Sequence, residues 1–178
     1  MSLLGEVLGV LEAERIPHAL IGAAAMALHG VSRATADIDF LTVDSRALGT
    51  ELWRGIEGSG VGVRLLKGDA DDPLAGSVRF TRTDERIVDV VVGRHAWQQE
   101  IVDAAETVSI GEASVRLAQP AGLVLLKLYA GGPKDAWDVH WLLESHEQAD
   151  AIRSEVESML PRLPAECRRL WDRIRAGR

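Results

Sequence analysis

The sequence predicts a mixed α/β fold, in which a twisted β-sheet flanked by helices is followed by a small helical cap. Two observations indicate this fold class. Up to residue 118, segments with helically spaced apolar residues alternate with short strand-like runs rich in β-branched residues. From Gln119 onward the apolar spacing is helical throughout. We therefore predict an α/β core over residues 1–118 and a helical cap over residues 119–178.

The predicted core begins with an amphipathic helix. Leucine and valine at helical spacing predict this helix over residues 3–15, and Pro17 ends it because proline lacks the amide hydrogen a helix needs. A short apolar run predicts the first strand at residues 18–21. Gly22 closes that strand, and the small residues that follow predict a tightly packed helix over residues 23–29.

The remainder of the core alternates strands with helices. Asp44 and Ser45 provide an N-cap for one helix, and Thr83 to Glu85 form a turn that joins two antiparallel strands. The predicted strands are residues 35–43, 61–66, 77–81, 86–92 and a hairpin of 108–110 with 114–117, and the predicted helices are residues 46–57 and 96–105.

Four helices are predicted for the cap. Pro120 and Pro133 occupy first-turn positions, where the missing amide hydrogen costs nothing, and Gly131-Gly132 separates the first two helices. The four helices are predicted at residues 120–130, 133–144, 148–160 and 165–176.

The composition is that of an ordinary soluble globular protein, with 178 residues, 47% hydrophobic and 26% charged residues. The net charge of -7 argues against a broad, charge-driven nucleic-acid surface. Cys167 is the only cysteine, so an intrachain disulfide is excluded and a reducing compartment is expected. We see no signal peptide, and no apolar segment reaches the ~18 residues that span a bilayer, so a cytoplasmic protein without a membrane partner is expected.

Three aspartates form the candidate centre. Asp37 and Asp39 alternate along a predicted strand, so their carboxylates share a face and repel each other unless a cation lies between them. Asp89 interrupts an apolar run, residues 87–92, where burial and strand propensity both disfavour it. A surface pair and an edge strand with one polar face remain open as alternatives. We expect strand pairing to bring Asp89 beside the other two.

Three carboxylates without histidine or cysteine suit a hard cation such as Mg²⁺ or Mn²⁺ rather than zinc. Two such ions would stabilise the attacking and leaving oxygens of a phosphoryl-type transfer. Gly22, between a strand and a helix, exposes backbone amides that can receive phosphate oxygens, although such turns also occur in any α/β core for packing reasons.

The order of glycine turn, acidic pair and distant third aspartate resembles the nucleotidyltransferase superfamily with the DNA polymerase β-like fold. Residues 21–30 and 33–40 are similar to the AbiEii-type, or type IV toxin-like, branch of that superfamily. The later segment Lys134-Asp135-Ala-Trp-Asp138, preceded by Lys127, also matches that branch. The resemblance covers residues 18–144 and implies a nucleotidyltransferase-type mixed sheet.

The resemblance implies a metal-dependent enzyme that moves a nucleoside monophosphate from an NTP, such as ATP, to an acceptor hydroxyl. The acceptor could be a tRNA, a protein or a small molecule. Asp37 and Asp39 would bind both metal ions, and Asp89 would hold the catalytic ion and take the acceptor's proton. The resemblance also implies a role in a toxin–antitoxin or phage-defence system, with a cognate antitoxin as a partner.

The resemblance further implies a nucleotide-binding set. Backbone amides of the glycine turn would hold the phosphates, two lysines would lie near the triphosphate, and the aspartates of the later helix would orient them or contact the acceptor. Arg33 would neutralise either a phosphate or Asp37. This chain has alanine where many members of the superfamily have serine after the glycine. The implied set is Gly22, Ala23, Arg33, Thr35, Lys127, Lys134, Asp135 and Asp138.

Other interpretations of these residues stay open. Lys134 and Asp138 are four apart and could form an ordinary surface pair on a helix, and Asp135 could be a charge favoured by the helix dipole. A metal-dependent nuclease would also cluster carboxylates, but Val90 and Val91 follow Asp89 where one large nuclease class has lysine. A non-catalytic binding protein on the same fold is the third alternative.

Overall fold

The computed structural model describes residues 1–31, 37–58, 60–110 and 113–177, and the chain divides into two compact units. Unit 1 contains the described residues of Met1–Ala24 and Ala34–Ala118. Unit 2 contains those of Ala25–Arg33 and Gln119–Arg178.

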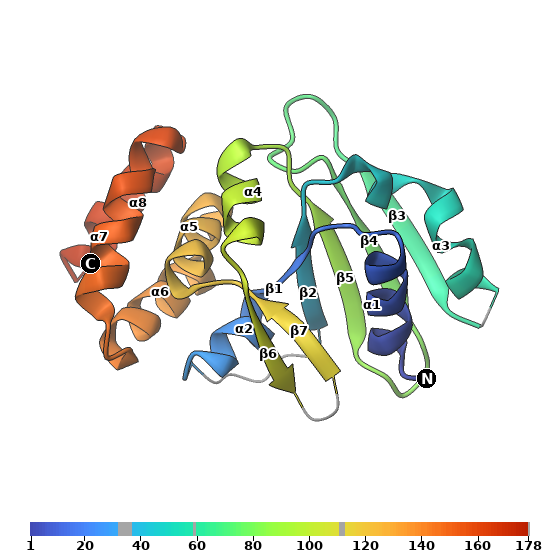
Figure 1. Ribbon diagram of the computed structural model, residues 1–178. Helices are drawn as coiled ribbons and strands as arrows, with labels where there is room; N and C mark the ends of the chain where they lie inside the picture. The colour runs from blue at the N-terminus through green and yellow to red at the C-terminus, as the bar shows by residue number, and fades with distance from the viewer. Residues whose placement is uncertain (32–36, 59, 111–112, 178) are drawn as a thin grey trace. The chain divides into compact units, whose positions relative to one another are not determined.

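Unit 1 is built on a mixed seven-stranded sheet with the strand order β3-β4-β5-β2-β1-β7-β6, in the described part of the chain (Figure 1). The central strand β2 pairs antiparallel with β1 and parallel with β5, and β4 pairs antiparallel with β5. The strands are β1 (Ala19–Ile21), β2 (Asp37–Thr42), β3 (Gly62–Lys67), β4 (Gly76–Thr81), β5 (Ile87–Val92), β6 (Glu106–Ile110) and β7 (Ala113–Leu117).

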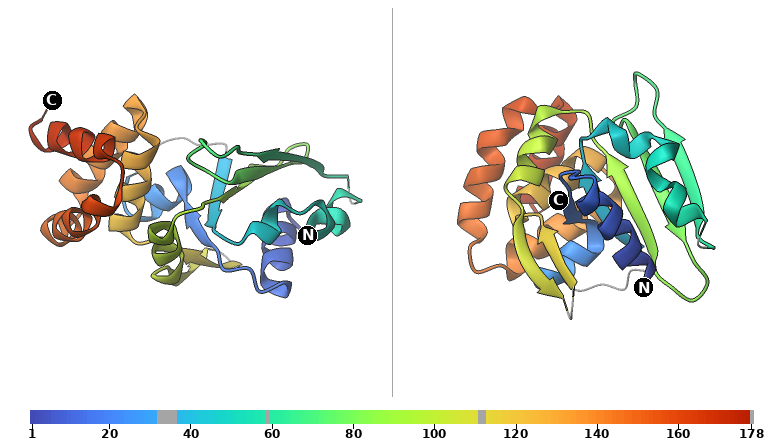
Figure 2. Two further views of the ribbon diagram at one scale, coloured as in Figure 1. Left: turned by 90° about the horizontal axis from the view of Figure 1, so that it is seen from above. Right: turned by 45° about the vertical axis from the view of Figure 1, so that its right-hand side comes forward.

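The helices of unit 1 lie on one face of this sheet, apart from the start of α2 (Figure 2, left view). The chain enters α2 directly from β1 at Gly22. The helices are α1 (Leu3–Ala13), α2 (Gly22–Leu28, of which Gly22–Ala24 belong to unit 1), the 3₁₀ helix η1 (Ser45–Leu48), α3 (Thr50–Glu57) and α4 (Ala96–Asp103).

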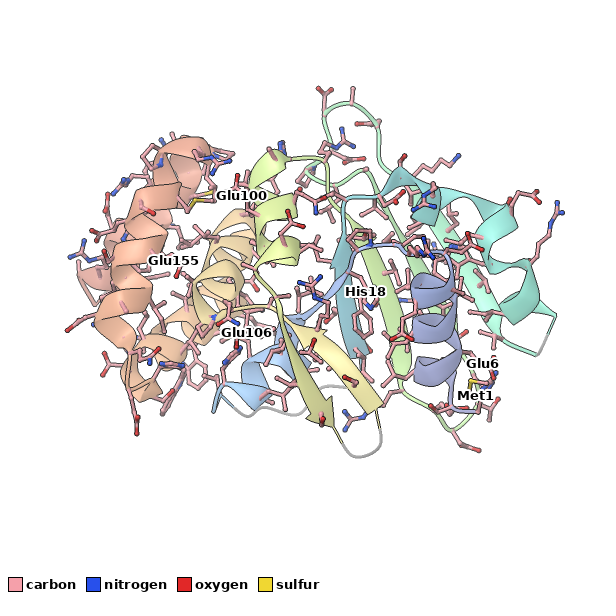
Figure 3. The ribbon with its side chains drawn as sticks, in the orientation of Figure 1. Met1, Glu6, His18, Glu100, Glu106 and Glu155 are labelled. Carbon is pink, nitrogen blue, oxygen red and sulfur yellow. The ribbon has the colours of Figure 1, made fainter. Side chains whose placement is uncertain are left out.

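The two faces of the sheet differ because side chains alternate along each strand. The covered face is apolar: Phe40, Phe80 and Val90 are fully buried beneath the helices. Trp53 of α3 packs edge-on against Phe80, with the ring centroids 4.7 Å apart. His18, at the start of the first strand segment, packs edge-on against Phe40 and is buried (Figure 3). The opposite face carries the charged residues described below.

The N-terminal helix is tied to the β4–β5 turn by an ionic network. Glu6 of α1, which Figure 3 labels near the start of the chain, pairs with Arg82 at 2.8 Å. Arg82 also pairs with Glu85 at 3.0 Å, and Glu85 accepts a hydrogen bond from the backbone amide of Leu3 at 2.6 Å. The bond from Leu3, followed by that from Arg82, lowers the pKa of Glu85. The network fixes α1 beside the hairpin that carries Asp89.

Unit 2 is helical. Its longest apolar segment lies on α5, where Leu123, Val124, Leu125 and Leu128 are buried against the neighbouring helices. Gly131 ends α5 in the left-handed conformation, and Pro133 begins α6. The helices are the remainder of α2, α5 (Pro120–Ala130), α6 (Pro133–Ser145), α7 (Ala149–Met159), the 3₁₀ helix η2 (Leu160–Arg162) and α8 (Ala165–Arg175).

The structure confirms the predicted mixed sheet flanked by helices. One predicted helix, residues 46–57, is wrong in part. It is split into η1 and α3 at Gly49, whose backbone is extended (φ -86°, ψ 124°), since glycine has a low helix propensity. The start of the strand predicted at residues 35–43 lies outside the described residues. No helix in the described ranges is long and apolar enough to cross a membrane.

Candidate active site

Neighbouring strands bring four residues into one row across the sheet of unit 1. Asp39 on β2 lies opposite Asp89 on β5, and Asp89 lies opposite Arg79 on β4. Arg79 in turn lies opposite Arg64 on the edge strand β3. Residues opposite each other in a ladder share a face and are about 5 Å apart. The row therefore places two carboxylates beside two guanidinium groups.

The three predicted aspartates share this face. Asp37 lies two residues before Asp39 on β2, so its side chain points the same way. The parallel pairing of β2 with β5 brings Asp89 beside them, as the sequence predicts. Asp89 is buried, with 7% of its surface exposed, whereas Asp37 and Asp39 are half-buried. The sheet thus gathers all three carboxylates, and their proposed roles stay predictions.

Arg79 forms a bidentate salt bridge with Asp89. Its Nε donates to Oδ1 of Asp89 at 2.9 Å, and its Nη2 donates to Oδ2 at 2.7 Å. The same Nη2 lies 3.7 Å from Oδ2 of Asp37. A two-pronged arginine–carboxylate bond is among the stronger charge-assisted contacts. Arg79 therefore places a positive charge between the carboxylates of Asp37 and Asp89.

This arrangement explains how a charged residue is accommodated in the apolar strand β5. A buried carboxylate is strongly unfavourable unless a cation pairs with it and satisfies its oxygens. The hydrogen bonds to Asp89, with its charge and the charges of Asp37 and Asp39, raise the pKa of Arg79 above its usual value. The carboxylates stabilise the guanidinium, and the guanidinium makes the burial of Asp89 tolerable.

Arg79 is the residue that sequence reasoning missed. It alternates with Val78 and Phe80, so it reads as an ordinary exposed position on an amphipathic strand. The signal was present in the predicted hairpin. In an antiparallel hairpin centred on Asp84, residue 79 pairs with residue 89, because each lies five residues from the turn. The structure has this pairing.

Gly22, the first residue of α2, lies directly against the side chain of Asp39. Its φ of +68° is in the left-handed region, where a side chain is strained. A Cβ on Gly22 would lie 2.1 Å from Oδ2 of Asp39, far inside van der Waals contact. The turn between β1 and α2 therefore requires glycine both for its backbone conformation and for the approach of the carboxylate.

Three further residues, Ala23, Arg33 and Thr35, are predicted to lie near this turn. Ala23 is buried, with 4% of its surface exposed. Arg33 and Thr35 lie outside the described residues. Their predicted contacts with phosphate stay predictions.

The donor set fits a hard divalent cation in its chemistry, because three carboxylates on one face of adjacent strands offer only oxygen ligands. Within the described ranges, no three carboxylate, imidazole or thiol side chains are arranged so that they could ligate a metal ion as they stand. Binding would require these side chains to change rotamer, and the metal assignment stays a prediction.

Unit 2 holds the second predicted cluster. The Nζ of Lys127 on α5 lies 2.8 Å from Oδ1 of Asp135 and 2.8 Å from Oδ2 of Asp138, both on α6. The other oxygen of Asp135 accepts the backbone amide of Gly132 at 3.1 Å and so caps α6. The hydrogen bonds and charges of both aspartates outweigh burial and raise the pKa of Lys127.

This cluster settles part of the interpretation of the α6 motif. Asp138 is 1% exposed, so it is a buried partner of Lys127 rather than half of a surface pair with Lys134. Lys134 itself is exposed on the first turn of α6. That these lysines serve the nucleotide stays a prediction.

The sequence model of the family described as "Nucleotidyl transferase AbiEii toxin, Type IV TA system" matches residues 9–168. No curated protein matches the chain.

Solved structures share the fold. The solution structure of the antibiotic-resistance factor ANT(2'')-Ia has a TM-score of 0.56 at 14% identity and covers 90% of each chain. Its crystal structure in complex with adenylyl-2''-tobramycin has a TM-score of 0.56 at 18% identity and covers 90% of this chain and 96% of that one. An antigenic nucleotidyltransferase-like protein from Paracoccidioides brasiliensis has a TM-score of 0.51 at 17% identity and covers 99% of this chain and 87% of that one. At such identities the likeness concerns the fold.

Proposed function

Because the chain belongs to the AbiEii nucleotidyltransferase toxin family, we propose that it transfers a nucleoside monophosphate from an NTP to a hydroxyl group of an acceptor. One observation carries the proposal. The sheet register gathers Asp37, Asp39 and Asp89 on one face, and Gly22 lies directly against Asp39.

In the proposed reaction the acceptor oxygen attacks the α-phosphorus of the NTP in line with the leaving group. A new oxygen–phosphorus bond forms, the bond to the β-phosphate oxygen breaks, and pyrophosphate leaves. Asp89 would accept the hydroxyl proton. Asp37, Asp39 and Asp89 would hold Mg²⁺ or Mn²⁺, which when bound would neutralise the charge that develops on the phosphate oxygens.

The remaining contacts to the nucleotide are proposed from the family motifs. Backbone amides of Gly22 and Ala23 would receive phosphate oxygens, since Ala23 offers no hydroxyl. Arg33 and Thr35 would flank the acidic strand. Lys127 would act through the two aspartates that hold it. The proposed set in the helical unit is Lys127, Lys134, Asp135 and Asp138.

The acceptor and the biological setting belong to the same proposal. A tRNA, a protein hydroxyl and a small molecule are the three acceptor classes. The crystal structure of ANT(2'')-Ia in complex with adenylyl-2''-tobramycin shows an adenylylated small molecule bound to a protein of similar fold, which supports the third class. The family description supports a toxin that works with a cognate antitoxin.

Replacement of Asp39 with asparagine tests the proposal. Asparagine keeps the shape of the side chain but removes the charge, so Mg²⁺-dependent transfer from labelled NTP to components of a cell lysate should fall more than about 100-fold. Asp71→Asn, in an exposed loop, is the matched control and should retain wild-type transfer. Full transfer activity in Asp39→Asn would contradict the assignment.

A non-catalytic binding protein is the second candidate, and the ion pair of Arg79 with Asp89 favours it. Such a pair neutralises the carboxylate without any ligand. Calorimetry with Mg²⁺ and each NTP separates the two candidates. An enzyme should bind one or more NTPs in the presence of Mg²⁺, and the absence of nucleotide binding would favour the second candidate.

A further inference from the structure

We propose that Arg79 is an exchangeable counter-cation, which holds Asp89 while no metal is bound and must leave it before a divalent cation can bind there. The inference rests on the proposed function, because the cation is the one that nucleotidyl transfer would use. It adds to that function that Arg79, on the neighbouring strand β4, controls how tightly the site binds a metal ion.

The guanidinium group of Arg79 occupies the place that a metal ion would need. It bonds to both oxygens of Asp89 and reaches to within 3.7 Å of Asp37. A magnesium ion would approach the same oxygens to about 2.1 Å. A divalent cation and a guanidinium group on one carboxylate repel each other, so the two compete for Asp89.

The burial of Asp89 makes this an exchange of one cation for another. Its side chain is only 10% exposed, so the ionised carboxylate is strongly disfavoured unless a cation is bound to it. Arg79 supplies that cation in the structure, and a metal ion would supply it afterwards. Because the ion pair must be broken first, its free energy is subtracted from the free energy of metal binding.

The guanidinium group of Arg79 has room to leave. Its side chain is 47% exposed, in contrast to that of Asp89. It lies on the charged face of the sheet beside exposed Thr81 and opposite exposed Arg64. Rotation of the side chain into solvent would therefore leave the apolar core on the other face intact.

The test is the affinity for Mn²⁺, measured by electron paramagnetic resonance on the full chain. Arg79→Gln keeps a hydrogen-bonding side chain without the charge, and it should bind Mn²⁺ about tenfold more tightly than the wild type. Its melting temperature in EDTA should fall, because Asp89 loses its cation, and saturating Mn²⁺ should restore it. Arg64→Gln, on the same face, is the matched control and should bind Mn²⁺ like the wild type.

Equal or weaker Mn²⁺ binding by Arg79→Gln would overturn the inference. If that variant does not fold, Arg79→Lys replaces it. Lysine retains the charge but not the two-pronged contact, so this variant should also bind Mn²⁺ more tightly than the wild type, and equal affinity would overturn the inference.

Transfer assays on the same proteins separate this inference from the proposed function. Wild-type transfer with equal Mn²⁺ affinities would overturn the exchange and leave the function standing. Tighter Mn²⁺ binding by Arg79→Gln would support the exchange. If neither the wild type nor any of the variants then transferred a nucleotide, the result would count against the proposed function.

Discussion

Gly22 and Asp39 constrain each other at the level of single atoms. The absence of a side chain on Gly22 leaves the space that Oδ2 of Asp39 fills, and the left-handed backbone of Gly22 turns the chain from β1 into α2. Any larger residue would move either the turn or the carboxylate. The position of Asp39 is thus constrained by the first residue of α2.

Gly22→Ala should therefore impair both folding and function. The left-handed conformation alone costs roughly 1–2 kcal/mol for a residue with a Cβ. The clash adds to this and displaces Asp39, so both the melting temperature and labelled-NTP transfer should fall. Thermal denaturation and the transfer assay measure the two effects.

Gly60 provides the control for this prediction. Its φ is +81°, but among the described residues a Cβ there would meet no atom within 4 Å. Gly60→Ala should lower the melting temperature through backbone strain alone and retain transfer. If Gly22→Ala retains full transfer as well, the contact with Asp39 has no functional importance.

The sequence predicts the residues of the candidate centre better than their electrostatic partner. The alternation of Asp37 and Asp39 on a strand is enough to place them on one face. Arg79 could not be inferred in the same way, because arginine on the polar face of a strand is common. Its significance follows only once its opposite residue, Asp89, is identified as buried.

At the level of helices and strands, the sequence predicts where most elements lie along the chain but not which strands pair with each other. A run of β-branched residues predicts β5, and the alternation of aspartate with apolar residues predicts β2. The parallel pairing of these two strands, in contrast, depends on the connection between them. The hairpin of β4 and β5 was predictable because a short turn joins adjacent strands. The register of a sequence-distant pair such as Asp39 and Asp89 is a tertiary property.

Helices α5 and α6 are joined by the cluster of Lys127, Asp135 and Asp138. Lys127→Met should destabilise the protein by about 3 kcal/mol, because it removes the cation that lies 2.8 Å from the buried carboxylate of Asp138. For a chain of this size the melting temperature should fall by roughly 10 °C. Differential scanning calorimetry checks this prediction, and exposed Lys134→Met should change little by comparison.

The same cluster predicts a dependence of stability on pH. The folded-state pKa of Lys127 is raised above its usual 10.5. Its ion pairs therefore contribute fully below pH 10.5, and the contribution is lost as the pH rises through the folded pKa. Urea denaturation of the wild type and Lys127→Met should show a difference in stability that shrinks only in strongly alkaline solution. A difference that is constant across that range would show that packing, not charge, is responsible.

On the scale of the whole molecule, the chain passes between its two units more than once. The sequence predicts a single boundary at residue 118, and the structure has a boundary there. The segment that follows the first turn of α2 also belongs to the helical unit, where Ala25 and Met26 are buried. The composition of this segment does not indicate that it belongs to the helical unit.

A fragment of residues 1–118 should consequently fold poorly. It would retain the α2 segment that belongs to unit 2 but lack the other helices of that unit. We expect the fragment to lack a cooperative urea transition that the full chain shows by circular dichroism. A cooperative transition with the full-chain midpoint would mean that the core is independent of residues 119–178.

The β4–β5 hairpin has a consequence for the order in which the chain folds. Arg79 and Asp89 lie in one hairpin, so they can pair through a local contact before more distant strands meet. Joining β5 to β2 closes a much longer loop and brings Asp89 against Asp39. The hairpin thus arrives at β2 with its carboxylate already neutralised, which removes a repulsion that would otherwise oppose that pairing.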